Sequence, residues 1–295
     1  MKPASWRADL ALAGIALIWG ATFVLVKEAL RDASTLVFLS LRFALATLAL
    51  GCASRPLAAK FSERAVLMRG GLAAGLCLFA GYLLQTLGLR YTTPSKSAFL
   101  TGLSIVMVPL IAALINRRAP SGAELLGVTA ATAGMALMTL QGGLGGMNVG
   151  DLLTLACAAG FALHILAVGH WAPRTNFQAL TLVQLATAAL LASGSFWWAE
   201  PAYLRWTSAV AAALVVTGLL ATALAFSVQA WAQQRTTATH TALMFALEPV
   251  FASLTSWLTT GERLSARQAA GAALILAGIL QVELKPLRRR QHLSE

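Results

Sequence analysis

Charged residues are scarce in this chain. Asp, Glu, Lys and Arg make up 11% of its 295 residues, whereas hydrophobic residues make up 58%. A water-soluble domain carries charge on about a quarter of its residues, so an ordinary soluble globule is excluded. A lipid environment removes the difficulty, provided that every backbone polar group is hydrogen-bonded within helices or a closed barrel.

Cysteine pairs and the common metal-binding and catalytic motifs are also missing. Cys52, Cys77 and Cys157 stand alone in apolar segments, without a CxxC pair or the His/Cys spacing of a metal site. The sequence has no HExxH, GxSxG or nucleotide-binding motif and no paired acids inside an apolar run. These absences argue against an intramembrane enzyme, a metal site or another cofactor, and direct use of ATP.

The hydrophobic residues occur in long runs without alternation, which predicts membrane-spanning helices and not barrel strands. Each run has about 20 residues, the length that crosses a hydrocarbon core of roughly 30 Å. Breaks at Pro, Gly, Asn or charged residues separate ten candidate spans. They lie near residues 9–27, 35–53, 66–90, 95–115, 122–140, 150–171, 178–198, 207–234, 239–259 and 267–284.

The basic residues are distributed unevenly between the two ends of these spans. If the N-terminus is cytoplasmic, 14 of the 22 Lys and Arg residues fall on the cytoplasmic side and 7 on the other, while Arg42 lies within a span. Because basic residues favour the cytoplasmic side, we predict that both termini are cytoplasmic, in a bacterial inner membrane. The basic tail is expected to bind anionic lipid headgroups or to be simply solvated. Short basic clusters between spans do not indicate nucleic-acid binding.

The two halves of the chain match at a fixed offset of 144 residues over a stretch of about 60 residues. Tyr82–Gln85 aligns with Phe226–Gln229, and a weaker match at an offset of 142 aligns Asp9 with Asp151. Because about five spans, an odd number, separate equivalent points, the second copy enters the membrane from the opposite side. Inverted copies around a central site are typical of secondary transporters that work by alternating access.

We therefore predict an all-α integral membrane protein with ten transmembrane helices arranged as two inverted five-helix repeats. The first repeat is expected at residues 1–140 and the second at 150–284. A Gly-rich inter-repeat loop at 141–149 joins them, and the basic cytoplasmic tail occupies 285–295.

Six short motifs follow one another along nearly the whole chain: Ile18–Phe23, Arg42–Phe43, Gln85–Thr92, Ser97–Gly102, Leu247–Val250 and Gly261–Glu262. With these motifs the chain resembles the EamA-type transporters of the drug/metabolite transporter superfamily. The resemblance implies ten helices in two inverted repeats and export of amino acids, related metabolites or drugs. It also implies a central cavity lined by the first, third, fourth, sixth, eighth and ninth helices. The first copy has Asn116–Arg118 in place of the Gly-Glu loop, so this loop is not symmetric.

Ionisable residues inside spans are costly and usually face a cavity or a partner. Glu248, in the ninth span, could bind a substrate ammonium group or a proton, and Arg42 could bind an anionic group or gate the pathway. The alternatives are a fixed ion pair, or an Arg42 side chain that extends to the interface. Pro109 and Pro249 each remove a backbone hydrogen bond and predict kinks, which either serve gating or are only structural.

The remaining candidates are polar or aromatic side chains within spans. His164 could relay protons or be a hydrogen-bonded core histidine. Gln85 and Gln229, which the repeat relates, could bind substrate or bridge helices. Six aromatic side chains could form the wall for an apolar or cationic substrate, or serve packing alone: Trp19, Phe23, Tyr82, Phe99, Phe161 and Trp231.

The sequence thus predicts a secondary transporter that exports amino acids or related small metabolites by alternating access. The alternatives are a drug or nucleoside exporter of the same superfamily and a passive facilitator or channel. The expected partners are a small-molecule substrate and membrane lipids, with no nucleic acid and no cofactor. Both a monomer and a homodimer are compatible with the sequence.

Overall fold

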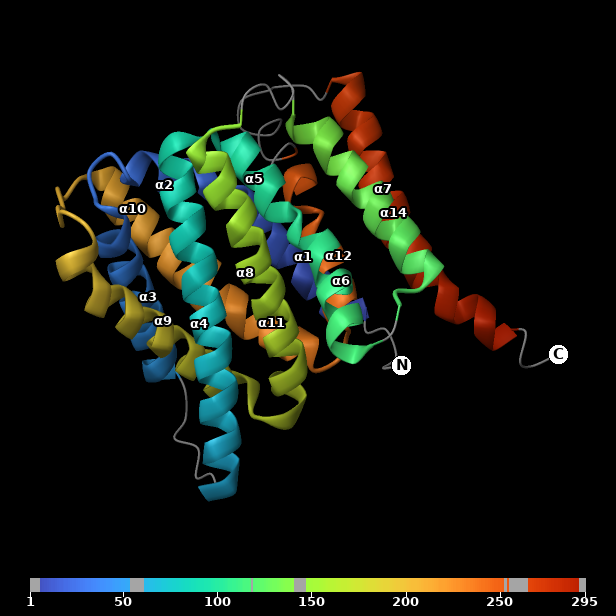
Figure 1. Cartoon of the computed structure of the whole chain (residues 1–295), viewed down its shortest axis with the longest axis horizontal. Helices are drawn as coiled ribbons and strands as arrows, with labels where there is room; N and C mark the ends of the chain where they lie inside the picture. Colours follow the sequence, from blue (N-terminus) through green and yellow to red (C-terminus); the bar gives the residue numbers. More distant parts are fainter. Residues whose placement is uncertain are drawn as a thin grey trace.

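The computed structural model describes residues 6–53, 61–117, 119–140, 147–251, 254 and 265–291. Helices account for nearly all of these ranges, and the one β-bridge found in them joins Ala33 to Leu204. The helices form one bundle (Figure 1). The prediction of an all-α fold is confirmed for this part of the chain.

The elements of the first half are α1 (Trp6–Gly20), α2 (Thr22–Ala29), α3 (Thr35–Ala53), α4 (Phe61–Tyr91), α5 (Pro94–Gly102), α6 (Ser104–Asn116) and α7 (Gly122–Thr139). Those of the second half are α8 (Val149–Trp171), η1 (Ala172–Arg174), α9 (Phe177–Ala199), α10 (Ser208–Val215), η2 (Val216–Leu224), α11 (Ala225–Gln233), α12 (Ala238–Phe245) and α14 (Ala266–Gln291). The segment η1 is a 3₁₀-helix and η2 is a π-helix.

Seven helical segments of the described chain are long and apolar enough to cross a membrane, and α7 contributes a shorter apolar stretch, Gly122–Met138. The pairs α1–α2 and α5–α6 each belong to one such segment, as do α10, η2 and α11 together. Part of the predicted span 239–259 lies outside the described residues, as do residues 141–146 of the predicted loop. The backbone of the predicted span 267–284 is described, and its side chains are described up to residue 281, which leaves out those of the basic tail.

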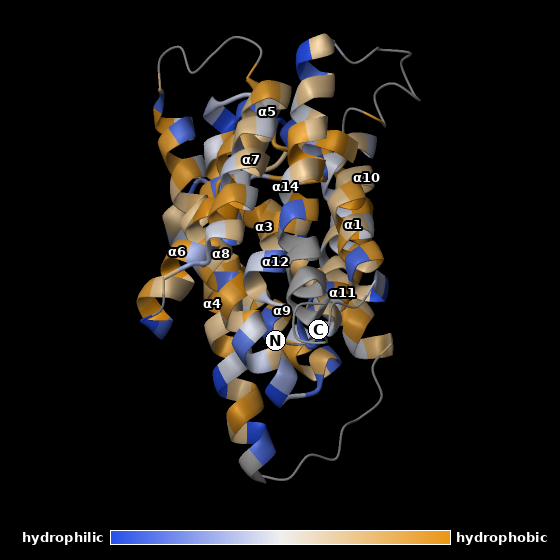
Figure 2. Cartoon of the chain, turned by 90° about the vertical axis from the view of Figure 1, so that its right-hand side faces the viewer, coloured by the Kyte–Doolittle hydropathy of each residue, from blue (hydrophilic) through white to orange (hydrophobic). Residues whose placement is uncertain are grey.

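The outer surface of the bundle is apolar. Large hydrophobic side chains are strongly exposed on it, among them Leu114 and Trp198, each 79% exposed. Figure 2 shows hydrophobic residues along the lengths of the helices and many of the hydrophilic ones toward the ends of the bundle. Such a surface is suited to lipid and not to water.

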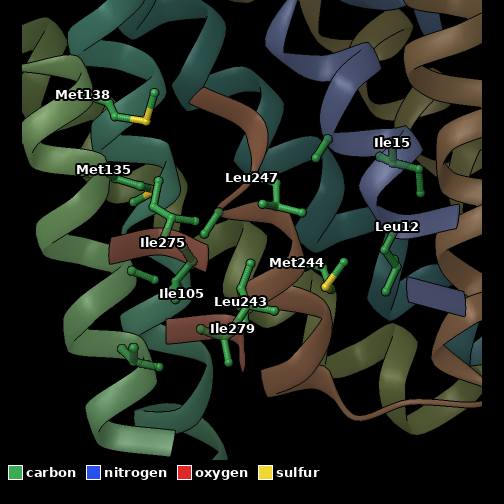
Figure 3. Packing of buried hydrophobic residues seen from close by; sticks show 14 of the residues in the cluster. Leu12, Ile15, Ile105, Met135, Met138, Leu243, Met244, Leu247, Ile275 and Ile279 are labelled. Atoms are coloured by element: carbon green, nitrogen blue, oxygen red, sulfur yellow. The ribbon is translucent and has the colours of Figure 1, made fainter. Parts of the chain in front are cut away.

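The largest buried apolar cluster joins the two halves of the chain (Figure 3). Because lipid tails are as apolar as these side chains, close packing is what holds such helices together in a membrane. The labelled members come from α1, α6, α7, α12, α14 and the segment after α12: Leu12, Ile15, Ile105, Met135, Met138, Leu243, Met244, Leu247, Ile275 and Ile279.

Helices α7 and α14 lie side by side (Figure 1) and meet at glycines. A Cβ atom on Gly134 would lie 2.5 Å from the carbonyl oxygen of Gly271, and one on Gly278 would lie 2.5 Å from that of Gly127. Gly127 and Gly134 are related to Gly271 and Gly278 by the offset of 144. Each of the two contacts is therefore the repeat-related copy of the other, as expected across a two-fold axis. These glycines therefore allow the two helices to pack closely.

Hydrogen bonds to loop carbonyls repeat in the same way. Arg90, at the end of α4, donates to the loop after α2, and Gln234, just after α11, donates to carbonyls in and after η1. The two donors are 144 residues apart in the sequence, and the acceptors are 142 residues apart. The same loop is therefore held by hydrogen bonds in each half of the chain. The bonds are Arg90 Nη1 to Leu30 O (3.1 Å), Arg90 Nη2 to Ala33 O (2.6 Å), Gln234 Nε2 to Ala172 O (2.9 Å) and Gln234 Nε2 to Thr175 O (3.3 Å).

The fourth and ninth predicted spans are interrupted at equivalent positions. Leu103 N, between α5 and α6, bonds to Leu100 O at 3.2 Å, and Leu247 N, after α12, bonds to Met244 O at 3.2 Å. Both are tighter turns than the i→i−4 pattern of an α-helix. The two interruptions lie beside the cavity described next.

Candidate functional site

A cavity lies among the helices and encloses about 840 Å³ that no protein atom occupies, including the part open to the surroundings. Residues of all six helices that the family resemblance implied contribute to its lining, and Arg42 of α3 joins them. Both halves of the chain therefore contribute to the wall of this cavity.

Nine of the thirteen candidate residues line this cavity together: Trp19, Phe23, Arg42, Tyr82, Gln85, Phe161, His164, Gln229 and Glu248.

The other four candidates lie elsewhere. Phe99 is buried in the large apolar cluster, and Trp231 packs against that cluster with the Arg235 guanidinium 4.4 Å from its ring centroid. Pro109 is buried inside α6, and Pro249 follows Glu248 just beyond the interruption of the ninth span. Neither proline is part of the cavity lining.

The cavity lies about the axis that relates the two halves. Residues of the first two spans match the second half at an offset of 142, and later residues match at 144, as the contacts above show. Seven repeat-related pairs line the cavity: Trp19 with Phe161, Thr22 with His164, Phe23 with Ile165, Tyr82 with Phe226, Gln85 with Gln229, Thr101 with Phe245, and Ser104 with Glu248.

Arg42 is held inside the bundle by two hydrogen bonds. Its Nε donates to Thr222 Oγ1 at 2.8 Å and its Nη2 donates to the Tyr82 hydroxyl at 3.0 Å. The guanidinium carbon also lies 4.3 Å from the Tyr82 ring centroid, and the residue is 3% exposed. The side chain therefore does not extend to the interface. Its Nη1 has no hydrogen-bond partner among the described residues.

The π-helical segment η2 explains part of this arrangement. The hydroxyl of Thr222, which accepts from Arg42, itself donates to Thr217 O at 2.6 Å. One turn of the same segment supplies Ala221 O, which accepts from Trp19 Nε1 at 2.9 Å. Such π-helical insertions occur frequently at functional sites, and here one positions two residues of the cavity wall.

Glu248 is half-buried at the cavity wall, beyond the interruption of the ninth span. Within the described ranges its carboxylate forms neither a hydrogen bond nor a salt bridge, and Arg42 forms no salt bridge either. The fixed ion pair that the sequence left open is thus not formed between them. Tyr82 interacts electrostatically with both residues. The cavity wall consequently carries one acidic and one basic side chain without a salt bridge between them.

Tyr82 is also the centre of an aromatic wall. Phe161 and Phe226 meet its ring edge to face, with centroids 5.2 and 6.0 Å away. Trp19 packs against Phe226 at 5.6 Å and against Phe245 at 4.8 Å. These contacts fix the rings, and their faces and edges give the cavity an apolar surface.

The buried amides show one unfilled acceptor. Gln233 Nε2 donates to Ile165 O at 2.9 Å, so its Oε1 must be the atom that accepts from Gln229 Nε2 at 3.0 Å. This leaves Gln229 Oε1 buried and without a partner. His164 also lines the cavity and is hydrogen-bonded through Nε2 to Gln184 Oε1 at 2.9 Å. It therefore has the partner of a core histidine as well as access to the site.

Sequence reasoning missed several lining residues, including Thr101, Ser104, Phe226 and Phe245. Phe226 could have been found, because the repeat aligns it with Tyr82. The hydroxyl residues carry no such signal, since serine and threonine are common inside membrane helices. Across the described residues, no group of three His, Cys, Asp or Glu side chains is arranged to hold a metal ion.

The chain is similar to transporters over its whole length. The model of the EamA-like transporter family matches residues 6–140 and again 148–283. An uncharacterised transporter of Archaeoglobus fulgidus is 33% identical over 278 residues, which cover 94% of this chain and 86% of the relative. The uncharacterised transporter YvbV of Bacillus subtilis is 25% identical over 95% of this chain and 92% of its own length.

A solved crystal structure shows the same fold, with a TM-score of 0.75 and 20% sequence identity over 98% of this chain and 99% of that one. Two family matches in one chain agree with the two halves that the repeated contacts relate. With an apolar exterior and a central cavity, the chain belongs to the EamA-like transporter family of integral membrane proteins.

Proposed function

We propose that this transporter carries small zwitterionic metabolites, amino acids above all, and exports them by alternating access. The observation that supports the substrate class is that one basic and one acidic side chain, Arg42 and Glu248, line one cavity without forming a salt bridge. Charges inside a membrane protein are expensive unless paired. A zwitterion supplies a partner for both at once, whereas a neutral or singly charged ligand leaves at least one without a partner.

The arrangement of donors agrees with this role. Because the Tyr82 hydroxyl accepts from Arg42, its own proton is available for a substrate carboxylate, next to Arg42 Nη1. The Glu248 carboxylate, which lines the same cavity, can accept from an ammonium group. The aromatic wall favours an apolar or aromatic side chain.

Alternating access fits a cavity that lies about the axis between two inverted halves. Export is the direction that the family resemblance implies. The distribution of basic residues supports an inner-membrane location with both termini in the cytoplasm. Exposed aromatic side chains at the opposite end, Trp197, Trp198 and Trp206, suit the outer interface.

The test is exchange in proteoliposomes loaded with one amino acid at a time from a panel of labelled amino acids. Saturable exchange that is accelerated by internal substrate identifies a carrier and not a channel. Competitors then define the substrate class: the amino acid, its decarboxylated amine and its N-acetyl derivative. We expect the zwitterion to compete at least about tenfold better than either analogue, since each analogue loses one charged hydrogen bond. Equal competition by all three, or no exchange of any amino acid, would overturn the proposal.

A further inference from the structure

Two contacts outside the cavity, each between an aspartate and a basic side chain, occupy repeat-related positions. Asp9 Oδ1 of α1 lies 2.8 Å from His240 Nε2 of α12, and Asp151 Oδ2 of α8 lies 3.4 Å from Lys96 Nζ of α5. Asp9 and Asp151 are 142 residues apart, and Lys96 and His240 are 144 apart. These are the offsets that relate the cavity-lining pairs. The same contact is therefore made twice, with the roles of the two halves exchanged.

The local geometry of the basic partners is also repeated. Thr93 Oγ1 accepts from Lys96 N, and Thr237 Oγ1 accepts from His240 N, both at 3.2 Å. Each basic side chain thus leaves its helix at the third position after a threonine cap. Lys96 and His240 are different residue types, but each occupies the same position after the cap and contacts an aspartate. The two halves thus share this contact, although the basic side chain differs.

The pairs lie at opposite ends of the transport pathway. Asp9 and Asp151 each precede an aromatic residue of the cavity wall, Trp19 and Phe161, by ten residues. Ten residues of helix measure about 15 Å, so each pair lies about that far from the cavity wall along its helix. Helices α5 and α8 begin at the upper end of the bundle, whereas the N-terminus of the chain lies at the lower end (Figure 1). Each pair joins two of the spans that line the cavity.

We propose that these pairs are two latches, one at each end of the pathway, of which the transport cycle opens one at a time. This inference rests on the proposed alternating-access function. Opening the lower end between α1 and α12 requires the Asp9–His240 latch to break, and opening the upper end between α5 and α8 requires the Lys96–Asp151 latch to break. In inverted-repeat transporters one repeat rocks against the other around the fixed site, so breaking one latch goes with keeping the other. Both latches are closed in this structure.

The test applies the same substitution to the two equivalent positions. In a background with the three cysteines replaced, Ser104→Cys places one thiol in the cavity, and a small membrane-impermeant thiol reagent is added to sealed vesicles of either orientation. Lys96→Ala should speed labelling of this thiol about fivefold when the reagent is on the side of the membrane at the upper end of the bundle. It should slow labelling when the reagent is on the other side. His240→Ala should do the reverse. Loss of one partly buried hydrogen bond or ion pair, worth about 1 kcal/mol, produces a shift of this size between two conformations of similar free energy.

The opposite direction of the two effects is what a merely structural contact would not produce. Two further variants remove the same latches from the other partner: Asp151→Asn, which can still accept at the start of α8, must agree with Lys96→Ala, and Asp9→Asn must agree with His240→Ala. Arg31→Ala is the control, because it removes an exposed ion pair with Glu28 that joins no two cavity helices. It should change labelling from neither side.

Labelling needs no substrate, so its result is independent of whether amino acids are exchanged. Changes in the same direction for both alanine variants, or no change in proteins with the melting temperature of the parent, would overturn the proposal. If an alanine variant does not fold, the asparagine variant of the same latch decides.

Discussion

Replacing Glu248 with glutamine tests the anionic side of the cavity most directly. The substitution keeps the length of the side chain and removes the carboxyl group that can carry a negative charge. Because the carboxylate has no hydrogen-bond or ion-pair partner within the described chain, no contact of the protein with itself is lost. We therefore expect the melting temperature to stay within about 2 °C of that of the parent, the range of a substitution that breaks no packing or pairing.

The expected effect on substrate binding is much larger. A hydrogen bond to a charged group contributes about 1.5–3 kcal/mol, so the dissociation constant of a zwitterionic amino acid should rise about 10- to 150-fold in Glu248→Gln. The N-acetyl derivative of the same amino acid has no ammonium group. Its weak binding should change less than about twofold, because Glu248 makes no charged contact with it.

Two measurements check this prediction. Calorimetric titration of the purified protein gives the dissociation constants, and counterflow in proteoliposomes gives exchange without any ion gradient. Glu28→Gln is the matched control, since Glu28 pairs with Arg31 on the surface and away from the cavity. Equal weakening of both ligands would refute the reasoning. Intact binding and exchange with loss of gradient-driven uptake would also refute it, because the carboxylate would then serve the proton and not the ammonium group.

Three further predictions concern packing and charge. A Cβ atom on Gly88 would lie 2.4 Å from a side-chain oxygen of α8 and 2.7 Å from a carbonyl oxygen, so Gly88→Ala should lower stability by about 1–3 kcal/mol in a thermal unfolding assay. Gly14→Ala, with nothing within 4 Å, should not. Arg90→Ala should lower the melting temperature more than Gln234→Ala, because the Arg90 guanidinium donates four hydrogen bonds, to Leu30, Ala33, Thr35 and Tyr203, whereas the Gln234 amide donates two. Arg42→Lys keeps the charge without the planar fork, so calorimetry should show weaker carboxylate binding, but less weakening than in Arg42→Gln.

The architecture could be predicted largely from the sequence because its signals are strong. Long apolar runs identify membrane helices, and the offset of 144 is carried by caps and glycines that serve packing, such as Gly134 and Gly278. Arg42 and Glu248 stand out because ionisable residues inside spans are rare. Their presence in one cavity depends on three-dimensional packing, which the sequence does not reveal.

The aromatic candidates show where sequence reasoning stops. Phe99 and Trp231 have the residue types of a cavity wall but pack in or against the apolar cluster. In a soluble protein the polar face of a helix marks the outside, whereas here lipid is as apolar as the interior. The pattern of hydrophobic residues therefore cannot tell which face of a span borders the cavity. Only the repeat, which pairs Trp19 with Phe161, carries information on that point.

The symmetry that builds the scaffold is broken at the charges. Arg42 is repeat-related to Gln184 at the offset of 142, and Glu248 is repeat-related to Ser104 at 144, so each charge has a neutral counterpart. Duplicated charges would place two arginines and two glutamates about the axis, at the cost of desolvating four ions. They would also offer a zwitterion two equivalent orientations. For the proposed zwitterionic substrate, one acidic and one basic side chain define a single orientation, with the carboxylate toward Arg42 and the ammonium group toward Glu248. In the proposed alternating-access cycle, the two halves would then exchange conformations around a substrate that keeps its orientation.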